Sequence, residues 1–144
     1  VSVASTRLGE AKGMLGATAN VDVVVSNLHA DDIDCAVVVG GMGSPEYLWE
    51  DHNLHTLLKN LNSQGKVIGA ICLSGAVLAR AGVLTGKQAT VYPIPESLKA
   101  LKDGHANYVE QPVVQDGHII TADGPPAASD FAETIIKELA KVKV

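Results

Sequence analysis

The strongest constraint on the fold is the alternation of short β-branched runs with helical stretches along the whole chain. The candidate strands cover residues 1–4, 21–25, 35–39, 67–70, 89–91 and 118–121. The candidate helices cover residues 51–62, 73–81, 95–101 and 128–142. This order predicts a mostly parallel sheet with helices on both faces. A chain of 144 residues is long enough for one core, so residues 1–144 are expected to form one domain.

Two segments depart from this alternation. Asp116 and Gly117 stand between apolar residues and predict a tight hairpin, and therefore one antiparallel pair near the end of the sheet. Residues 8–20 are rich in glycine and alanine, and we expect them to be weakly ordered. The sequence shows no repeat and no linker-like stretch that would divide the chain.

Charge and composition exclude several classes of partner. The net charge is -5 and the basic residues are scattered, which argues against a nucleic-acid partner. The apolar runs are strand-sized, whereas a membrane span needs roughly 20 residues. Two cysteines without CxxC spacing fit a reducing cytoplasm, and Cys35 at the start of a buried strand is interpreted as core packing. His52 and His55 have helical spacing but no third ligand, so we expect solvated helix residues and no metal site.

The segment K-V-I-G-A-I-C-L-S-G carries the clearest chemical signal. A buried strand leads into Cys72 and continues directly into a helix, with the small residues Ala70 and Ser74 two positions away on either side. This arrangement is typical of a nucleophile elbow, because bulky neighbours would clash in so tight a turn. The start of the helix would also favour a thiolate. The alternative is that Cys72 is only a buried apolar residue at a strand end.

A second glycine-rich turn follows another buried strand. The residues V-V-V-G-G-M-G, from Val37 to Gly43, end that strand in a glycine pair. Strand ends lie side by side at the carboxyl edge of an open α/β sheet, where ligands bind. The backbone N–H groups of Gly40 and Gly41 could therefore form an oxyanion hole facing Cys72. The alternative is an ordinary tight turn.

These motifs, together with A-G-V-L-T-G-K-Q-A-T-V-Y-P and D-G-H-I-I-T-A-D-G-P, resemble the ThiJ/PfpI superfamily in order and spacing over nearly the whole chain. The resemblance implies a flavodoxin-like three-layer α/β sandwich, a homodimer or higher oligomer, and a reactive elbow cysteine. It implies no cofactor. Members act as proteases, as glyoxalases or deglycases on methylglyoxal adducts, as redox-responsive chaperones, or as oxidative-stress sensors, so family membership alone does not define the activity.

The sequence departs from the family pattern beside the cysteine. Protease-like members have a histidine directly after it, where this chain has Leu73, and the stress-protective branch can have a histidine where this chain has Tyr92. Tyr92 could donate a hydrogen bond but is a poor base near pH 7, or it could simply pack with a polar tip. His105 is the histidine of second interest, with an exposed loop as the alternative.

The family pattern also begins with a strand and a helix whose connecting turn supplies a glutamate to the cysteine. This sequence starts at what resembles the second strand, so the first βα unit is absent from residues 1–144. Without a central strand, two sheet edges would remain unpaired. We therefore expect about 30 to 40 further residues, upstream or in a separate chain, the length of one strand and a crossover helix.

The sequence supports three functional hypotheses. In the first, Cys72 adds to a reactive carbonyl as a glyoxalase- or deglycase-type hydrolase or lyase does, or senses oxidants, with Gly41 and the Leu73 N–H stabilising the oxyanion. In the second, the chain is a non-catalytic, chaperone-like binding module. An intracellular cysteine peptidase is third, because Leu73 replaces the expected histidine.

Overall fold

A four-stranded sheet forms the centre of the computed structural model, which describes residues 1–142. The strand order is β5-β6-β10-β9, with β5, β6 and β10 parallel and β9 antiparallel to β10. The mostly parallel sheet predicted from the alternating pattern is therefore confirmed. The strands are β5 (Cys35–Val38), β6 (Val67–Ile71), β9 (Val113–Asp116) and β10 (Ile119–Ala122).

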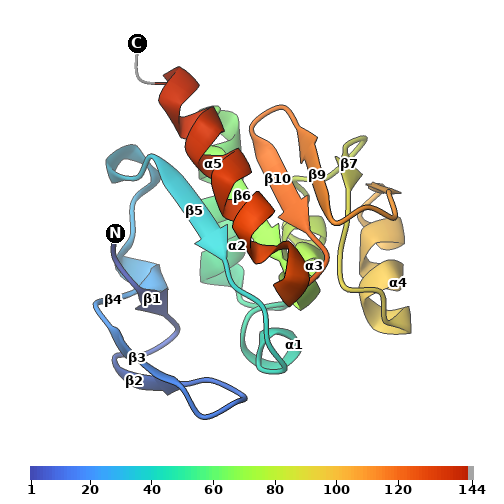
Figure 1. Ribbon diagram of the computed structural model, residues 1–144. Helices are drawn as coiled ribbons and strands as arrows, with labels where there is room; N and C mark the ends of the chain where they lie inside the picture. Colours follow the sequence, from blue (N-terminus) through green and yellow to red (C-terminus); the bar gives the residue numbers. More distant parts are fainter. Residues whose placement is uncertain (143–144) are drawn as a thin grey trace.

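Helices cover both faces of this sheet and complete three layers (Figure 1). One face carries α5, which packs on β6 and β10, and the opposite face carries α2 and α3, with α4 packed beside α3. The larger apolar core lies beneath α2, α3 and α4, and the smaller one beneath α5. The helices are α1 (Ser44–Tyr47), α2 (His52–Ser63), α3 (Gly75–Arg80), α4 (Pro95–Asp103) and α5 (Ala128–Val142).

One local signal was predicted from the sequence, and one glycine that carried no such prediction sets the packing of a helix on the sheet. The predicted antiparallel hairpin is present, but its turn lies one residue later: β9 ends at Asp116, which pairs with Ile119, and Gly117 and His118 join it to β10, with a φ of 62° at Gly117. In β6, a Cβ at Gly69 would lie 2.9 Å from the side chain of Ile135 and 3.0 Å from that of Phe131. Glycine at this position therefore lets α5 pack directly on the sheet.

The remaining strands are short and lie outside the central sheet. β1 pairs with β4 in parallel, β2 with β3 as a hairpin, and β7 with β8 in parallel. Four single 3-10 turns connect the longer elements. The short strands are β1 (Ala4–Ser5), β2 (Gly9–Lys12), β3 (Thr18–Val21), β4 (Val23–Val24), β7 (Gln88–Ala89) and β8 (Asn107–Tyr108), and the turns are η1 (Val25–Asn27), η2 (Ala30–Asp32), η3 (Cys72–Ser74) and η4 (Pro125–Ala127).

Three strand predictions are therefore wrong in extent or in partner. Residues 1–4 and 21–25 contribute only β1 and β4, which pair with each other and not with β5. Residues 89–91 contribute only the end of β7, because the Thr90 N–H donates to Thr121 Oγ1 of β10 at 2.9 Å and not to a strand carbonyl. The helix predicted over 73–81 begins with the turn η3 and is α-helical only over Gly75–Arg80.

The prediction of weak order for residues 8–20 is also wrong, because β2 and β3 form a paired hairpin there. Gly13 and Ala17 close its loop through an N–H···O bond of 2.6 Å, and Gly16 takes a φ of 94°. The strands are exposed on both faces, so they lack the alternation of apolar residues that identifies a strand in a sequence.

No helix within residues 1–142 has the length and hydropathy needed to cross a bilayer.

Candidate functional site

Cys72 occupies a strained turn at the carboxyl end of β6. The strand ends at Ile71, and Cys72 opens η3, which leads directly into α3. Its φ of 59° lies in the left-handed region, which non-glycine residues rarely adopt. The sharp strand-to-helix turn predicted from the small residues around the cysteine is thus present, and the side chain is half-buried. Such strain persists only where the surrounding structure enforces it.

Gly40 lies directly against the cysteine. A Cβ at Gly40 would be 2.7 Å from Cys72 Cβ and 3.0 Å from the Ile71 carbonyl oxygen, which leaves no room for a side chain. The same position is 3.5 Å from Cys72 Sγ. The neighbouring Gly41 has a φ of 106°. The structure therefore brings the glycine pair and the cysteine together, as the parallel strand order predicts.

Two buried serines connect the cysteine turn to the glycine turn. Ser74 Oγ donates to the Val39 carbonyl at 2.5 Å, and the Ser44 hydroxyl donates to Ser74 Oγ at 2.7 Å. Ser44 begins α1 and Ser74 ends η3, and both side chains are fully enclosed. Because the chain runs from hydroxyl to hydroxyl to carbonyl, it holds the end of β5 at a defined place beside Cys72.

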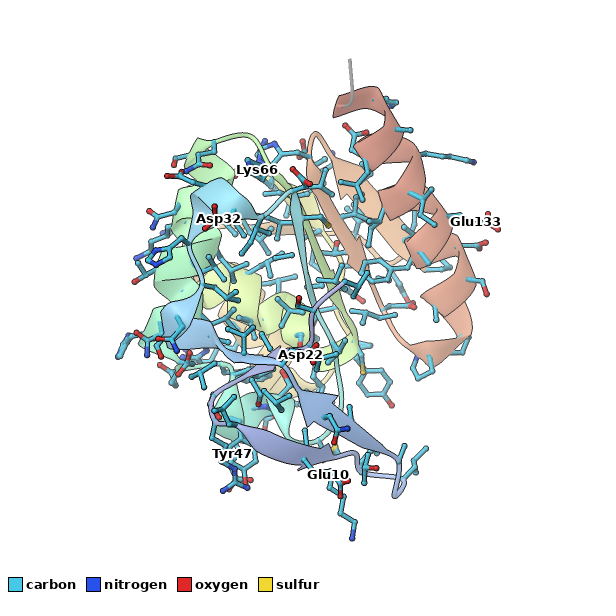
Figure 2. All side chains as sticks on the ribbon, turned by 90° about the vertical axis from the view of Figure 1, so that its left-hand side faces the viewer. Glu10, Asp22, Asp32, Tyr47, Lys66 and Glu133 are labelled. Carbon is cyan, nitrogen blue, oxygen red and sulfur yellow. The ribbon has the colours of Figure 1, made fainter. Side chains whose placement is uncertain are left out.

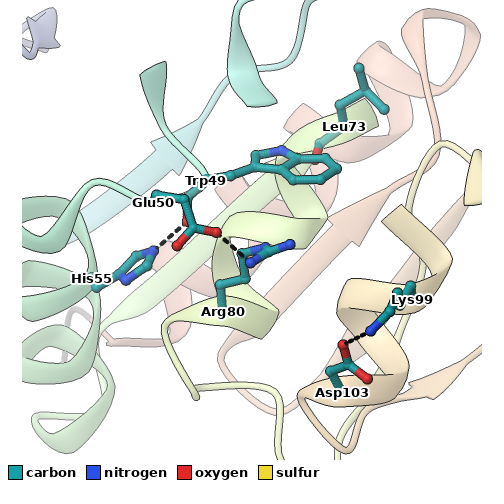
Figure 3. A network of polar contacts seen from close by, with 7 residues as sticks. All are labelled: Trp49, Glu50, His55, Leu73, Arg80, Lys99 and Asp103. Carbon is teal, nitrogen blue, oxygen red and sulfur yellow. Dashed lines mark hydrogen bonds and ion pairs between the residues drawn. The ribbon is translucent and has the colours of Figure 1, made fainter. Parts of the chain in front are cut away.

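Trp49 supports the same turn from the side of α2 (Figure 3). Its indole Nε1–H donates to the Leu73 carbonyl at 3.0 Å, while its own carbonyl accepts from His55 Nε2 at 2.7 Å. The Arg80 guanidinium lies 5.5 Å from the indole ring centre and pairs with Glu50. These contacts anchor the backbone that follows Cys72.

The expectation of two solvated histidines on α2 is wrong for one of them. His52 is exposed, but His55 is only 8% exposed because its ring bonds the Trp49 carbonyl. The i,i+3 spacing shows that two residues share a face, but not what lies against that face.

Within residues 1–142, no three His, Cys, Asp or Glu side chains gather closely enough to hold a metal ion.

The other predicted site residues are Tyr92, Leu73 and His105, and they differ in how close their side chains lie to Cys72. The Tyr92 N–H donates to the Cys72 carbonyl at 3.0 Å, so Tyr92 lies beside the turn, but its side chain is 47% exposed. The Leu73 side chain is buried in the core, which leaves only its backbone for the site. His105 follows Gly104, which contacts Ala79 near the C-terminal end of α3, whereas Cys72 precedes the N-terminal end. The length of α3 therefore separates His105 from the cysteine.

Cys35 is the first residue of β5 and is half-buried. Burial raises the pKa of the Cys35 thiol, and the negative charge of Asp34 raises that pKa further. Cys35 packs beside the apolar core beneath α5. It is therefore held as a thiol, and thiols react far more slowly than thiolates.

Sequence reasoning did not identify Ser44, Trp49 or Met14 as neighbours of the site. A Cβ at Gly41 would lie 4.0 Å from Met14 Sδ, so the loop of the β2–β3 hairpin reaches the glycine turn. Ser44 follows the glycine motif and could have been noticed as a polar residue at a strand end. Trp49 and Met14 carry no local signal, because only the packing of distant segments places them here.

Comparison with known proteins supports this description of the fold. The sequence model of the DJ-1/PfpI family matches residues 1–138. A protein of Methanocaldococcus jannaschii is 46% identical over 141 residues, covering 98% of this chain and 69% of that protein. A deglycase of Pyrococcus abyssi is 33% identical over 129 residues, covering 87% of this chain and 74% of that protein. The crystal structure of a ThiJ/PfpI domain protein from Brachyspira murdochii matches with a TM-score of 0.90 at 31% identity, covering 97% of this chain and 79% of that one.

Proposed function

The chain belongs to the DJ-1/PfpI family, and from this premise we propose that it is a stress-protective protein whose Cys72 reacts with small carbonyl compounds such as α-oxoaldehydes. The flavodoxin-like α/β fold shared with the solved family member provides the frame. Relatives from Pyrococcus abyssi and Thermococcus kodakarensis are named as deglycases, which supports a stress-protective role.

One observation carries the proposal: Cys72 has a φ of 59° between β6 and η3, with Gly40 against it. A backbone conformation of this kind costs about 1–3 kcal/mol, so it persists only where the surrounding structure enforces it. Such residues are found mainly at functional sites, where the strained conformation is part of the mechanism. A cysteine needed only for packing could occupy a strand or helix without this strain. The geometry therefore supports a role for the sulfur itself.

The first chemical step is an addition. The Cys72 sulfur attacks the aldehyde carbon, a C–S bond forms, and the carbonyl π electrons move to the oxygen. The proton lost from the thiol ends on that oxygen, and the product is a hemithioacetal. The backbone N–H groups of Gly41 and Leu73 are the proposed donors to the developing oxyanion. With an oxidant such as hydrogen peroxide, the same sulfur takes one oxygen to give a sulfenic acid and water.

Mass spectrometry with matched cysteine variants tests the proposal. The parent protein, Cys72→Ser and Cys35→Ser are treated with dilute methylglyoxal, and in a second series with hydrogen peroxide. We expect adducts and oxidation at Cys72 in the parent and in Cys35→Ser, and loss of more than nine-tenths of the modification in Cys72→Ser. Equal modification of Cys35 and Cys72 in the parent would contradict the proposal.

A second candidate function is a chaperone-like binding module, and the exposed apolar side chains of the N-terminal part favour it. Val3, Leu8, Met14 and Leu15 are all exposed, and exposed apolar side chains can bind partly unfolded clients. Suppression of client aggregation by Cys72→Ala at the parent's level would support this function, and loss of suppression would argue against it. A peptidase remains third, since Leu73 offers no base to Cys72.

A further inference from the structure

Asp123 follows β10 at the same level of the sheet as Cys72. β10 and β6 are parallel neighbours in which Ala122 pairs with Ile71, so the next residues, Asp123 and Cys72, leave their strands side by side. Ala122 packs in the core beneath α5, and successive side chains of a strand point to opposite faces of the sheet. The Asp123 side chain therefore lies on the other face, the one that carries α3.

The ring of Tyr92 lies beside the same segment. The Tyr92 N–H donates to the Cys72 carbonyl at 3.0 Å. A Cβ at Gly124 would lie 3.7 Å from Cδ1 of the Tyr92 ring. The segment Asp123–Gly124 and this ring therefore lie together on the β10 side of the cysteine turn, whereas the glycine turn lies on its β5 side.

The carboxylate of Asp123 makes this side of the site negative. Burial raises the pKa of the Tyr108 phenol, and the negative charges of Glu110 and Asp123 raise that pKa further. Asp123 is half-buried and forms no ion pair within residues 1–142. Its charge is therefore not neutralised by a neighbouring cation.

Basic side chains are absent from the part of the chain that forms this side. No lysine or arginine occurs in residues 103–136, which include β8, β9 and β10. Lys66 precedes β6 and lies at the end of the strands opposite to Tyr47 (Figure 2). Lys12 belongs to the β2–β3 hairpin, which approaches the site from the side of β5. A compound on the β10 side of Cys72 therefore meets negative charge.

We propose that Asp123 selects the compounds that react with Cys72 by their charge, and that the preferred substrate is a small carbonyl compound with a positively charged group. This inference rests on the proposed function, because it names the substrate class of the same cysteine. The positive group lies beside the Asp123 carboxylate while the carbonyl carbon meets the sulfur. The rings of Tyr92 and Tyr108 are 47% and 38% exposed, and the face of a phenol ring also attracts a cation.

The first experiment measures the charge preference of Cys72 with two thiosulfonate reagents of opposite charge. The variant Cys35→Ser keeps Cys72 as its single cysteine and is treated with 2-(trimethylammonio)ethyl or 2-sulfonatoethyl methanethiosulfonate. The thiolate attacks the sulfur that carries the alkyl group, an S–S bond forms, and methanesulfinate leaves. The ratio of the two rates is divided by the same ratio for 2-mercaptoethanol. The fraction of thiolate cancels in this ratio, because both reagents attack the same form of the same sulfur.

We expect the cationic reagent to be favoured by at least about fivefold, and added salt to reduce this preference because it screens the carboxylate. Asp123→Asn has nearly the same shape and should reduce the preference by at least about half. Asp103→Asn is the matched control, because it removes the same charge from an exposed side chain next to Gly104, at the far end of α3. The control should keep the ratio of the Cys35→Ser protein. No preference in that protein, or equal ratios in the two aspartate variants, would overturn the proposal.

The second experiment compares aldehydes as protectors of Cys72 against iodoacetamide. The aldehydes are trimethylammonioacetaldehyde, which is a cation, glycolaldehyde, which is neutral, and glyoxylate, which is an anion. After correction for the affinity of each aldehyde for 2-mercaptoethanol, the half-protecting concentration should be at least about fivefold lower for the cation than for the anion. Asp123→Asn should narrow this difference, and Asp103→Asn should not.

The two experiments separate this inference from the proposed function. Protection of Cys72 that is independent of the charge of the aldehyde would overturn the selection by Asp123 and leave the proposed function intact. Charge-dependent thiosulfonate rates without protection by any aldehyde would refute the carbonyl substrate, and with it the proposed function, whereas the charge selection at Cys72 would stand.

Discussion

At the scale of single residues, the turn at Cys72 depends on neighbours that have small side chains or none. Cys72 adopts φ 59° without being glycine, and the space beside it exists because Gly40 has no side chain. Ser74 Oγ donates to the Val39 carbonyl and accepts from the Ser44 hydroxyl, and this hydrogen-bond chain anchors the end of β5. Small residues thus provide both the room and the anchoring for one strained cysteine.

Gly40→Ala should disrupt this turn. The added Cβ would overlap Cys72 Cβ and the Ile71 carbonyl, both fixed parts of the structure, so we expect about 1–3 kcal/mol of lost stability and slower alkylation of Cys72. Gly43→Ala is the matched control, because its Cβ would meet Tyr47 at an ordinary 3.5 Å and its φ is -76°. Urea unfolding and iodoacetamide kinetics measure the two effects. Equal behaviour of both variants would refute the close-contact explanation.

His118 should make stability depend on pH. Burial lowers the pKa of His118, Lys87 lowers it further, and Glu138 opposes them, while its Nε2–H donates to Asn62 Oδ1 at 2.7 Å. The pKa of His118 is lower in the folded protein than in the unfolded chain. At pH values around these two pKa values, the unfolded chain therefore binds more protons than the folded protein. The contribution of His118 is therefore complete above about pH 6.5 and is lost as the pH falls through the folded pKa.

We expect the parent's melting temperature to decrease more between pH 7.5 and pH 5.5 than that of His118→Gln, which keeps a donor for Asn62 but does not titrate. Differential scanning calorimetry at matched ionic strength gives the comparison. Parallel pH profiles for the two proteins would show that another group controls stability in this range.

At the scale of elements, α2 shows how the capping residue before a helix sets where the helix begins. The Asp51 carboxylate accepts from the Leu54 N–H at 2.9 Å, and the leucines that follow form the buried face. The helix predicted over 51–62 and the observed His52–Ser63 differ by one residue at each end, because Asp51 is the cap and Ser63 is the last helical residue. The position of α2 matters for the site, since Trp49 lies just ahead of it and bonds the Leu73 carbonyl.

Asp51→Ala should lower the free energy of unfolding by about 1 kcal/mol, because the Leu54 N–H loses its acceptor. Asp51→Asn keeps an acceptor oxygen and should change stability by only a few tenths of that amount. Chemical unfolding followed by circular dichroism resolves the difference. A similar loss in both variants would assign the effect to charge and not to the cap.

At the scale of the whole molecule, burial is uneven along the chain. The two apolar cores are built from residues that begin at Val25, whereas nearly all of residues 1–20 are exposed. β6 and β10 carry fully enclosed side chains, including Ile68 and Ile120. The N-terminal part is therefore attached to the sheet through little buried surface.

Native-state hydrogen exchange should separate these two parts. Amides in residues 1–24 are expected to exchange at least a hundredfold faster than those of β6 and β10, because local opening there exposes little apolar surface. Mass spectrometry of peptic fragments provides the measurement. Uniform protection along the chain would contradict the description.

Local sequence patterns were sufficient to predict the α/β class, the parallel sheet, the β9–β10 hairpin and the turn at Cys72, because each rests on local periodicity or on small residues in a short segment. The three-dimensional packing was needed to show which strands join the central sheet, that His55 is buried against the Trp49 carbonyl, and that α3 separates His105 from Cys72. Packing also places Met14 beside Gly41. These features depend on contacts between residues far apart in the chain, whose pairing no local pattern encodes.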